Sequence, residues 1–420
     1  MNSSLCRYID DHSDRLFEIL SKIISFNTEN DGMRGCETPL SEYMCREYER
    51  LNINCAVYSP DEISGIKKHE EYLSGRNLEG RKNFTALLPC TREGSKQLML
   101  AAHLDTVPAG SLSLWSIDPF SGKNDNGKIY GRGACDDKYA LAACLFLAEA
   151  MCELGLKTKN RVYVSGYVDE EFGGGDGALA CCLKYPSDFY LNMDGNSFEI
   201  WNTATGGQRI GLYIKHPEPL QCCSKMLDGL CICRKSLESF GEARRLELKN
   251  DPRYQGTDIP ENAFRILSFD CGTNTNDKNV GHIDFAFYTN KGTDKICAEL
   301  EACYRRISLE LEELNLKIDK IFCRSRFFNF GECSKGSEDV KLLLSAGEEI
   351  LRRELPVCAS PLSDLSIFMK CSGGRAAGFG IGRGFGERGG AHQTDEYVLC
   401  SDLIDYTKII GEFISRWDND

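Results

Sequence analysis

Short apolar runs alternate with helical repeats in the first half of the chain. Residues 98–105, 161–171 and 188–194 are apolar runs that end in polar residues, as buried parallel strands do. Residues 14–24 place apolar side chains on one helical face, and residues 140–154 are apolar almost throughout. This alternation predicts an α/β sheet with helices on both faces.

Two further segments complete this part of the pattern. Residues 38–51 predict another amphipathic helix, whereas residues 59–82 are polar and interrupted. We expect residues 59–82 to form a long surface loop.

The pattern changes near residue 203. From there the chain predicts a strand, a helix, two strands, a helix and a strand, which is the βαββαβ order of a ferredoxin-like unit. These elements occupy residues 208–215, 220–240, 263–271, 282–289, 294–311 and 316–323. A helix, a last buried strand and a closing helix follow, at 338–355, 376–382 and 401–417. We therefore expect one α/β domain, made of residues 1–202 and 324–420, that is interrupted by a second domain at 203–323.

Charge and composition narrow the classes of partner. The chain has 50 Lys and Arg against 63 Asp and Glu, a formal net charge of −13. This balance disfavours nucleic acid as a partner, because binding to phosphates requires clustered Lys and Arg. The N-terminus has acids where a secretory signal has an apolar run. The longest apolar stretch, residues 139–148, is far shorter than the ~20 residues that span a bilayer. We expect a cytoplasmic protein with no membrane partner.

The 22 cysteines do not predict a disulfide scaffold or a zinc finger. Adjacent cysteines such as Cys181 and Cys182 do not bridge each other, and no CxxC pair is repeated. We interpret the cysteines as reduced, mostly buried thiols. A cysteine-rich metal store is the alternative, and it requires many more than two metal ions per chain.

Polar side chains follow the predicted strands. His103 and Asp105 end one strand, residues 169–171 end the next, Asp194 ends a third, and His392 follows the last strand. Asp136 precedes the long apolar helix. Ligands of open α/β sheets bind outside the carboxyl ends of the strands, so these side chains are candidates for one site.

Imidazole and carboxylate ligands suit zinc, with cobalt or manganese as alternatives. Residues two apart on a strand face the same side, so Asp105 can accept a hydrogen bond from His103. Glu170 and Glu171 leave their strand in different directions, so one can bind metal while the other acts as a base. Each residue also has a structural alternative. A histidine on an apolar strand is usually a core residue, Asp136 or Asp137 can be a helix N-cap, and Asp194 can be a turn former.

Several motifs in order resemble the family of co-catalytic zinc amidohydrolases and exopeptidases that includes acetylornithine deacetylase, succinyl-diaminopimelate desuccinylase, aminoacylase and glutamate carboxypeptidase. The resemblance covers essentially the whole chain, and residues 59–83 resemble the deacylase branch. The motifs are HLDTVP (103–108), WSIDPF (115–120), YGRGACDDK (130–138), DEEFGG (169–174), Ser363-Asp364 and AHQTDEYV (391–398).

The resemblance implies a role for each matching residue. Asp136 takes the place of a carboxylate that bridges two divalent metal ions. His103 and Asp194 match the ligands of one ion, and Glu171 and His392 match those of the other. Glu170 takes the place of the general base, and Asp105 that of the carboxylate that orients His103.

The inserted domain matches the lid or dimerisation domain of the family, so we expect a homodimer formed through it. His216 is the candidate for the lid histidine that stabilises the oxyanion, with His282 as a competitor and a surface histidine as the alternative. Asn279 matches an asparagine that contacts the substrate. An arginine of the family that pairs with a substrate carboxylate appears here as Tyr288. Arg383 and Arg388 are candidate replacements, and solvated loop charges are the alternative.

These matches predict a metal-dependent hydrolase of a small N-acyl amino acid or a related acylated amine. The alternative within the family is a dipeptidase or carboxypeptidase that takes a short peptide, and Asp194 in the ligand position favours those members. A non-catalytic relative would usually lack a metal ligand or the general base. This chain has both histidines, Asp136 and Glu170 in the matching positions.

Overall fold

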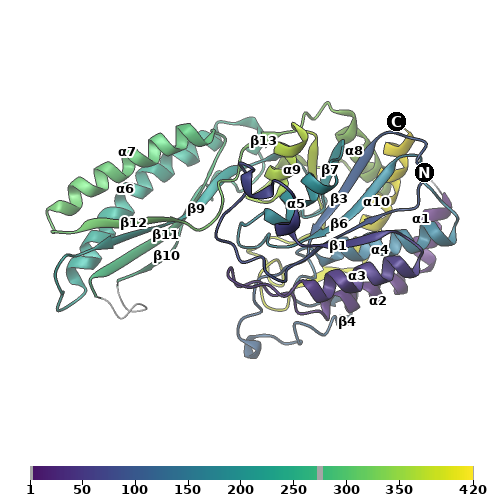
Figure 1. Cartoon of the computed structure of the whole chain (residues 1–420), viewed down its shortest axis with the longest axis horizontal. Helices are drawn as coiled ribbons and strands as arrows, with labels where there is room; N and C mark the ends of the chain where they lie inside the picture. The colour runs from purple at the N-terminus through teal and green to yellow at the C-terminus, as the bar shows by residue number, and fades with distance from the viewer. Residues whose placement is uncertain (1–2, 272–277, 420) are drawn as a thin grey trace. The chain divides into compact units, whose positions relative to one another are not determined.

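The chain divides into two units by the contacts among its residues (Figure 1). The computed structural model describes residues 3–271 and 278–419. The first unit comprises Met1–Asn202, Glu332–Ser360 and Ile367–Asp420, and the second comprises Thr203–Gly331 and Pro361–Ser366. The second unit extends past the expected limit at residue 323, because Phe328 pairs with Gly207 in an isolated bridge.

A mixed sheet forms the centre of the first unit. Its strand order is β1-β2-β6-β3-β7-β15-β8-β13, and β14 pairs with β8 off this path. The pairs β3·β6, β3·β7 and β7·β15 are parallel, whereas β1·β2, β2·β6 and β8·β15 are antiparallel. The strands are β1 (Cys55–Tyr58), β2 (Asn83–Leu87), β3 (Gln97–His103), β6 (Arg161–Tyr167), β7 (Phe189–Asn192), β8 (Ile200–Ala204), β13 (Gly331–Glu332), β14 (Val357–Ala359) and β15 (Ala376–Phe379).

Helices cover both faces of this sheet. The chain passes from β3 through α4 (Lys138–Glu153) to β6 on one side, and from β6 through α5 (Asp176–Lys184) to β7 on the other side of β3. Because such crossovers are right-handed, opposite directions place α4 and α5 on opposite faces. α4 is buried along almost its whole length, as its apolar sequence predicts.

The remaining elements of this unit complete its layers. α2 packs on α4, α1 and α8 pack on α10, and α3 packs on β1 and β2. A small separate sheet has the order β16-β5-β4. These elements are α1 (Ser3–Asp11), α2 (Ser13–Ile24), α3 (Thr38–Arg50), β4 (Asn124–Asp125), β5 (Lys128–Tyr130), α8 (Glu338–Leu351), α9 (Leu365–Ser372), β16 (Tyr397–Leu399) and α10 (Cys400–Asn419).

The second unit has the predicted βαββαβ order. Its antiparallel sheet runs β10-β11-β9-β12, and α6 and α7 lie together on one side of it (Figure 1). Alternate residues of β9 and β11, such as Leu212 and Phe285, pack against these helices. The elements are β9 (Gly206–Lys215), α6 (Ser224–Lys249), β10 (Phe264–Asp270), β11 (Val280–Thr289), α7 (Thr293–Glu312) and β12 (Lys317–Cys323).

Helix length and hydropathy bear on membrane association. Within residues 3–271 and 278–419, no helix is both long and apolar enough to cross a bilayer.

Candidate metal centre

The carboxyl ends of β3, β6 and β7 bring together the residues that the sequence singles out. His103 is the last residue of β3, Glu170 and Glu171 follow β6, and Asp194 follows β7. These strands are parallel neighbours, so their carboxyl ends lie at one edge of the sheet.

Asp136 contacts both histidines of this edge. Its Oδ1 lies 3.0 Å from Nε2 of His103, and its Oδ2 lies 3.2 Å from Nε2 of His392. Glu171 adds an oxygen, Oε2, at 2.7 Å from the same nitrogen of His392. One carboxylate therefore reaches towards two imidazoles with its two oxygens, as a bridging ligand does.

The possible ligand atoms of three residues lie close together, and these three differ from the set that the resemblance assigns to one ion. Ligand atoms of His103, Asp136 and Glu171 all lie within 4.8 Å of one another. The family resemblance assigns Glu171 to the ion of His392 and not to that of His103. The division of the ligands between two ions therefore stays a prediction.

The charges around this cluster fit a cation. Burial raises the pKa of Asp194 well above its usual value, and Asp136 adds to this effect. Burial also raises the pKa of Glu171, with partial opposition from His392. Oδ1 of Asp137 is buried without a hydrogen-bond partner in the described residues, 3.6 Å from Nε2 of His103. Buried carboxylates in this excess are satisfied by cations, and nitrogen and oxygen ligands together suit zinc.

The two imidazoles respond to the same charges. Burial acts to lower the pKa of His103, but Asp137 and Asp136 outweigh it and raise the pKa well above its usual value. Burial is likewise outweighed at His392, where Glu171 and Asp136 raise the pKa to about 11. The neighbouring carboxylates therefore favour positive charge at both rings.

Asp105 supports the cluster differently from the expectation. Nδ1 of His103 lies 2.8 Å from the main-chain carbonyl oxygen of Asp105, whereas the carboxylate Oδ1 is 3.9 Å away. The Asp105 carboxylate instead accepts hydrogen bonds from the backbone N–H groups of Glu170 and Glu171, both at 3.1 Å. Asp105 thus orients His103 through its carbonyl and holds the turn that carries the two glutamates.

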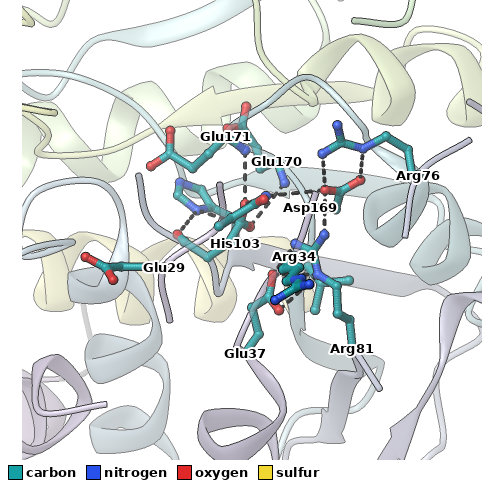
Figure 2. A network of polar contacts seen from close by, with 12 residues as sticks. Glu29, Arg34, Glu37, Arg76, Arg81, His103, Asp169, Glu170 and Glu171 are labelled. Carbon is teal, nitrogen blue, oxygen red and sulfur yellow. Dashed lines mark hydrogen bonds and ion pairs between the residues drawn. The ribbon is translucent and has the colours of Figure 1, made fainter. Parts of the chain in front are cut away.

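An ion-pair network lies behind this turn (Figure 2). Asp169 has a left-handed backbone (φ 70°), and its buried carboxylate accepts from Arg76 and from Arg81. Arg81 is only 2 % exposed and also pairs with Glu37. Asn30 donates to Asp105 at 2.9 Å and to Asp169 at 3.3 Å, which joins the network to the turn.

The sequence reasoning missed this network. Arg76 and Arg81 belong to the segment predicted to be a surface loop, and that prediction is wrong for Arg81. The physical reason is that its partner Asp169 lies 88 residues away along the chain. The only local signal is the presence of two arginines in the glycine-containing stretch SGRNLEGRKN.

A second buried pair joins the loops that carry Asp136 and His392. Arg132 pairs with Glu396 at 2.6 Å, and the other oxygen of Glu396 accepts from the backbone N–H of Cys135 at 3.0 Å. His392 itself has a left-handed backbone (φ 63°). The pair fixes the two ligand loops relative to each other.

The remaining candidates make local contacts. Arg383 pairs with Glu387 at 2.8 Å, and its guanidinium lies 4.5 Å from the ring centre of Tyr397. His216, in the second unit, has Nδ1 2.7 Å from the carbonyl oxygen of Glu218. Its Nε2 is buried with no hydrogen-bond partner in the part of the chain that the structure describes.

Asn279 holds the loop that follows β9. Its carbonyl accepts from the backbone N–H of His216 at 2.9 Å, and its side-chain oxygen accepts from that of Leu220 at 2.7 Å. The side chain therefore has a structural contact besides the predicted role in substrate binding.

Comparisons with known proteins agree with this geometry. Residues 99–416 match the sequence profile of Peptidase family M20/M25/M40. The chain is 26% identical to N-formyl-4-amino-5-aminomethyl-2-methylpyrimidine deformylase of Bacillus subtilis (strain 168), over 99% of this chain and 97% of that protein.

Solved structures share the fold. The dipeptidase Dug1p from Saccharomyces cerevisiae has a TM-score of 0.77 at 12% identity, over 100% of this chain and 98% of that one. The YXEP protein of Bacillus subtilis, described as a dinuclear metal binding peptidase, has a TM-score of 0.61 at 13% identity, over 98% of this chain and 99% of that one.

Proposed function

The chain belongs to Peptidase family M20/M25/M40 and is a metal-dependent hydrolase of carbon–nitrogen bonds, and we propose that it cleaves the amide bond of a small acylated amine with Glu170 as the general base. The single observation that carries the proposal is the contact of Asp136 with both His103 and His392. A carboxylate whose two oxygens face two imidazoles could serve as a shared ligand if two divalent ions bind here.

The proposed ligands are His103, Asp136, Glu171, Asp194 and His392, and the proposed metal is zinc, with cobalt or manganese as alternatives. When bound, such ions polarise a substrate carbonyl and lower the pKa of water. The chain contributes the positions of these donors, which are fixed by strand ends and by the buried pair of Arg132 and Glu396.

Two observations support Glu170 as the proposed general base. Its backbone N–H is held by Asp105, and its carboxylate lies close enough to His103 to raise the pKa of that ring. We propose that Glu170 takes the proton of the attacking water and then delivers it to the nitrogen of the leaving amine, so that the carboxylate is regenerated. His216 is the proposed donor to the oxyanion, and Asn279 and Arg383 are proposed to contact the substrate.

The substrate class rests on two features. Tyr288 occupies the place of an arginine that would bind a carboxylate, and its hydroxyl accepts from Arg265 at 2.6 Å. The relative whose alignment covers 99% of this chain is named as a deformylase of an N-formylated aminomethylpyrimidine. That compound is an acylated amine without an amino-acid carboxylate. N-formyl and N-acetyl amines are therefore the first substrates to test, followed by N-acetyl and N-succinyl amino acids.

A dipeptidase or carboxypeptidase is the second candidate. The observation that favours it is Asp194, an aspartate in a ligand position that resembles the peptidase members. Dipeptides with free amino ends, assayed beside the acylated amines, separate the two candidates by the ratio of their kcat/KM values.

The decisive variant is Glu170→Gln, with His103→Ala for comparison. We expect Glu170→Gln to keep the metal content of the wild type while kcat falls by about three or more orders of magnitude. His103→Ala should lose metal together with activity. A Glu170→Gln variant with wild-type turnover would remove the proposed base, and a wild type that binds no divalent ion would remove the metal centre.

We also propose a cytoplasmic homodimer that forms through the second unit. The acidic composition and the absence of a spanning helix from residues 3–271 and 278–419 are compatible with this location. Light scattering over a range of concentrations tests the assembly, and a mass of one chain throughout would refute it.

A further inference from the structure

The face of the second unit's sheet that points away from α6 and α7 carries a row of arginines. Arg265 of β10 pairs with Ala286 of β11, and Ala286 pairs in turn with Arg209 of β9. Arg324 continues the row beyond β12, because its backbone N–H donates to the carbonyl of Arg209 at 2.8 Å. Residues paired across strands share one face, so three guanidinium groups project from the same side.

This row is distinct from the core of the unit. The neighbouring residues on β9 and β11, Ile210 and Phe285, face the opposite side and belong to the apolar core formed with residues of α6 and α7. The arginines therefore lie on the side that the helices leave open.

The three arginines differ in what they contact. Arg324 pairs with Asp284 at 3.1 Å and donates to the hydroxyl of Tyr213 at 2.6 Å. Arg265 donates to the hydroxyl of Tyr288 at 2.6 Å and lies over its ring. The guanidinium of Arg209, by contrast, has no hydrogen bond or ion pair within the described residues, and its Nε is buried.

The neighbours of Arg209 offset its positive charge only in part. Burial lowers the pKa of Arg209, Asp284 opposes this, and Arg324 and Arg265 lower it further. Asp284 is the one acid among these neighbours, and Arg324 already occupies both of its oxygens. A buried donor that lacks a partner loses its hydration without compensation, so a bound anion would stabilise it.

Small residues lie between the arginines on this face. A side chain at Gly211 would place its Cβ 2.7 Å from Oδ1 of Asp284 and 3.2 Å from Nε of Arg324. Ala286 lies between Arg265 and Arg209 across the strands, and its side chain is a single methyl group. Asp284 and Arg324 therefore pack directly over Gly211, two residues along β9 from Arg209.

We propose that this face holds an anion-binding site centred on the guanidinium of Arg209, for the carboxylate or phosphate group of a small molecule. The guanidinium of Arg209, which has no partner within the described residues, can donate two parallel hydrogen bonds to two oxygens of either group. Arg265 and Arg324 supply positive charge on its two sides. The site lies wholly within the second unit and does not depend on the hydrolase activity.

Isothermal titration calorimetry of the full chain tests the site with inorganic phosphate and with acetate, at an ionic strength held constant with sodium chloride. We expect Arg209→Gln to weaken the binding of at least one anion by roughly tenfold or more, since it removes a charge-assisted fork. Arg305→Gln, on the exposed surface of α7, is the matched control and should bind as the wild type does. Tighter binding of phosphate than of acetate would identify a phosphate ligand, and the reverse would identify a carboxylate.

Further measurements separate this site from the metal centre and from misfolding. Anion bound at the metal centre should persist in Arg209→Gln, so only the component that this variant loses is assigned to the site. Circular dichroism should show the variant folded, because the lost side chain has no partner in the native state. Arg265→Gln, at the exposed end of the row, should weaken the same component about threefold. Equal binding by wild type and Arg209→Gln, or an equal loss in Arg305→Gln, would overturn the proposal.

Discussion

Replacing Arg81 by leucine should show how strongly the ion-pair network behind the turn of Glu170 and Glu171 depends on one guanidinium. Nε of Arg81 lies 3.0 Å from each oxygen of Glu37, and Nη1 lies 2.8 Å from Asp169. Both carboxylates have fully buried side chains. Asp169 would keep Arg76 and Asn30, whereas Glu37 has no other ion pair in the described residues. The variant therefore leaves one buried carboxylate without its counter-ion.

The magnitude follows from that burial. Removal of one partner from a buried ion pair costs about 3–5 kcal/mol, because the other charge stays buried and uncompensated. This loss is a large share of the about 5–15 kcal/mol that stabilises a typical domain. Arg50→Leu is the matched control, since Arg50 is 71 % exposed in its pair with Glu47. A pair whose guanidinium is exposed contributes far less than a fully buried pair, on the order of 1 kcal/mol or less.

The loss should also depend on pH. Burial raises the pKa of Glu37 to about 7, and Arg81 opposes this rise. Without Arg81 the pKa in the folded state rises further, while the unfolded value stays near 4.5. A raised pKa in the folded state favours folding at low pH and disfavours it as the pH rises. Above pH about 7 the gap between wild type and variant should therefore widen by about 1.4 kcal/mol per pH unit.

Urea denaturation at pH 6, 7.5 and 8.5 measures these differences. The double variant Glu37→Gln, Arg81→Leu should lose the added pH dependence, since the titrating group is gone. A stability loss no larger than that of Arg50→Leu, or a loss that stays constant with pH, would refute the reasoning.

Two further predictions concern residues that support the site, and a third concerns an exposed thiol. Gly174→Ala should lower kcat at least about tenfold, because the new Cβ would lie 1.8 Å from Oδ2 of Asp169 and displace the turn before Glu170, the proposed base; unchanged kinetics would contradict this. Glu396→Gln should lower the free energy of unfolding by about 3–5 kcal/mol in urea denaturation, because it leaves the buried guanidinium of Arg132 without its counter-ion. Cys222 is exposed, and hydrogen bonds with Ser224 lower the pKa of its thiol. It should therefore be the first thiol that a disulfide reagent labels, which peptide mapping of the labelled protein would show.

The sequence by itself determined the elements that carry the candidate ligands. Apolar runs end at His103 and before Asp194 because buried strands must be apolar along their length and polar where they reach the ligand edge. The helix of residues 140–154 was expected within two residues of its observed start at Lys138, since an apolar run of that length has no other stable form in an α/β unit. The βαββαβ order was also evident, because strand and helix periods differ.

Only the tertiary structure decided which charged residues support the site and which face of the second unit is open. Arg81 and Glu396 are charged residues in predicted loops, and local sequence gives no reason to bury them. Their partners, Asp169 and Arg132, lie 88 and 264 residues away along the chain. The sequence around Arg209 is that of an ordinary strand. Only the alignment of neighbouring strands shows that its side chain lies beside two other arginines and lacks a hydrogen-bond partner within the described residues. Local periodicity fixes elements, whereas the pairing of buried charges depends on contacts between segments that are distant in sequence.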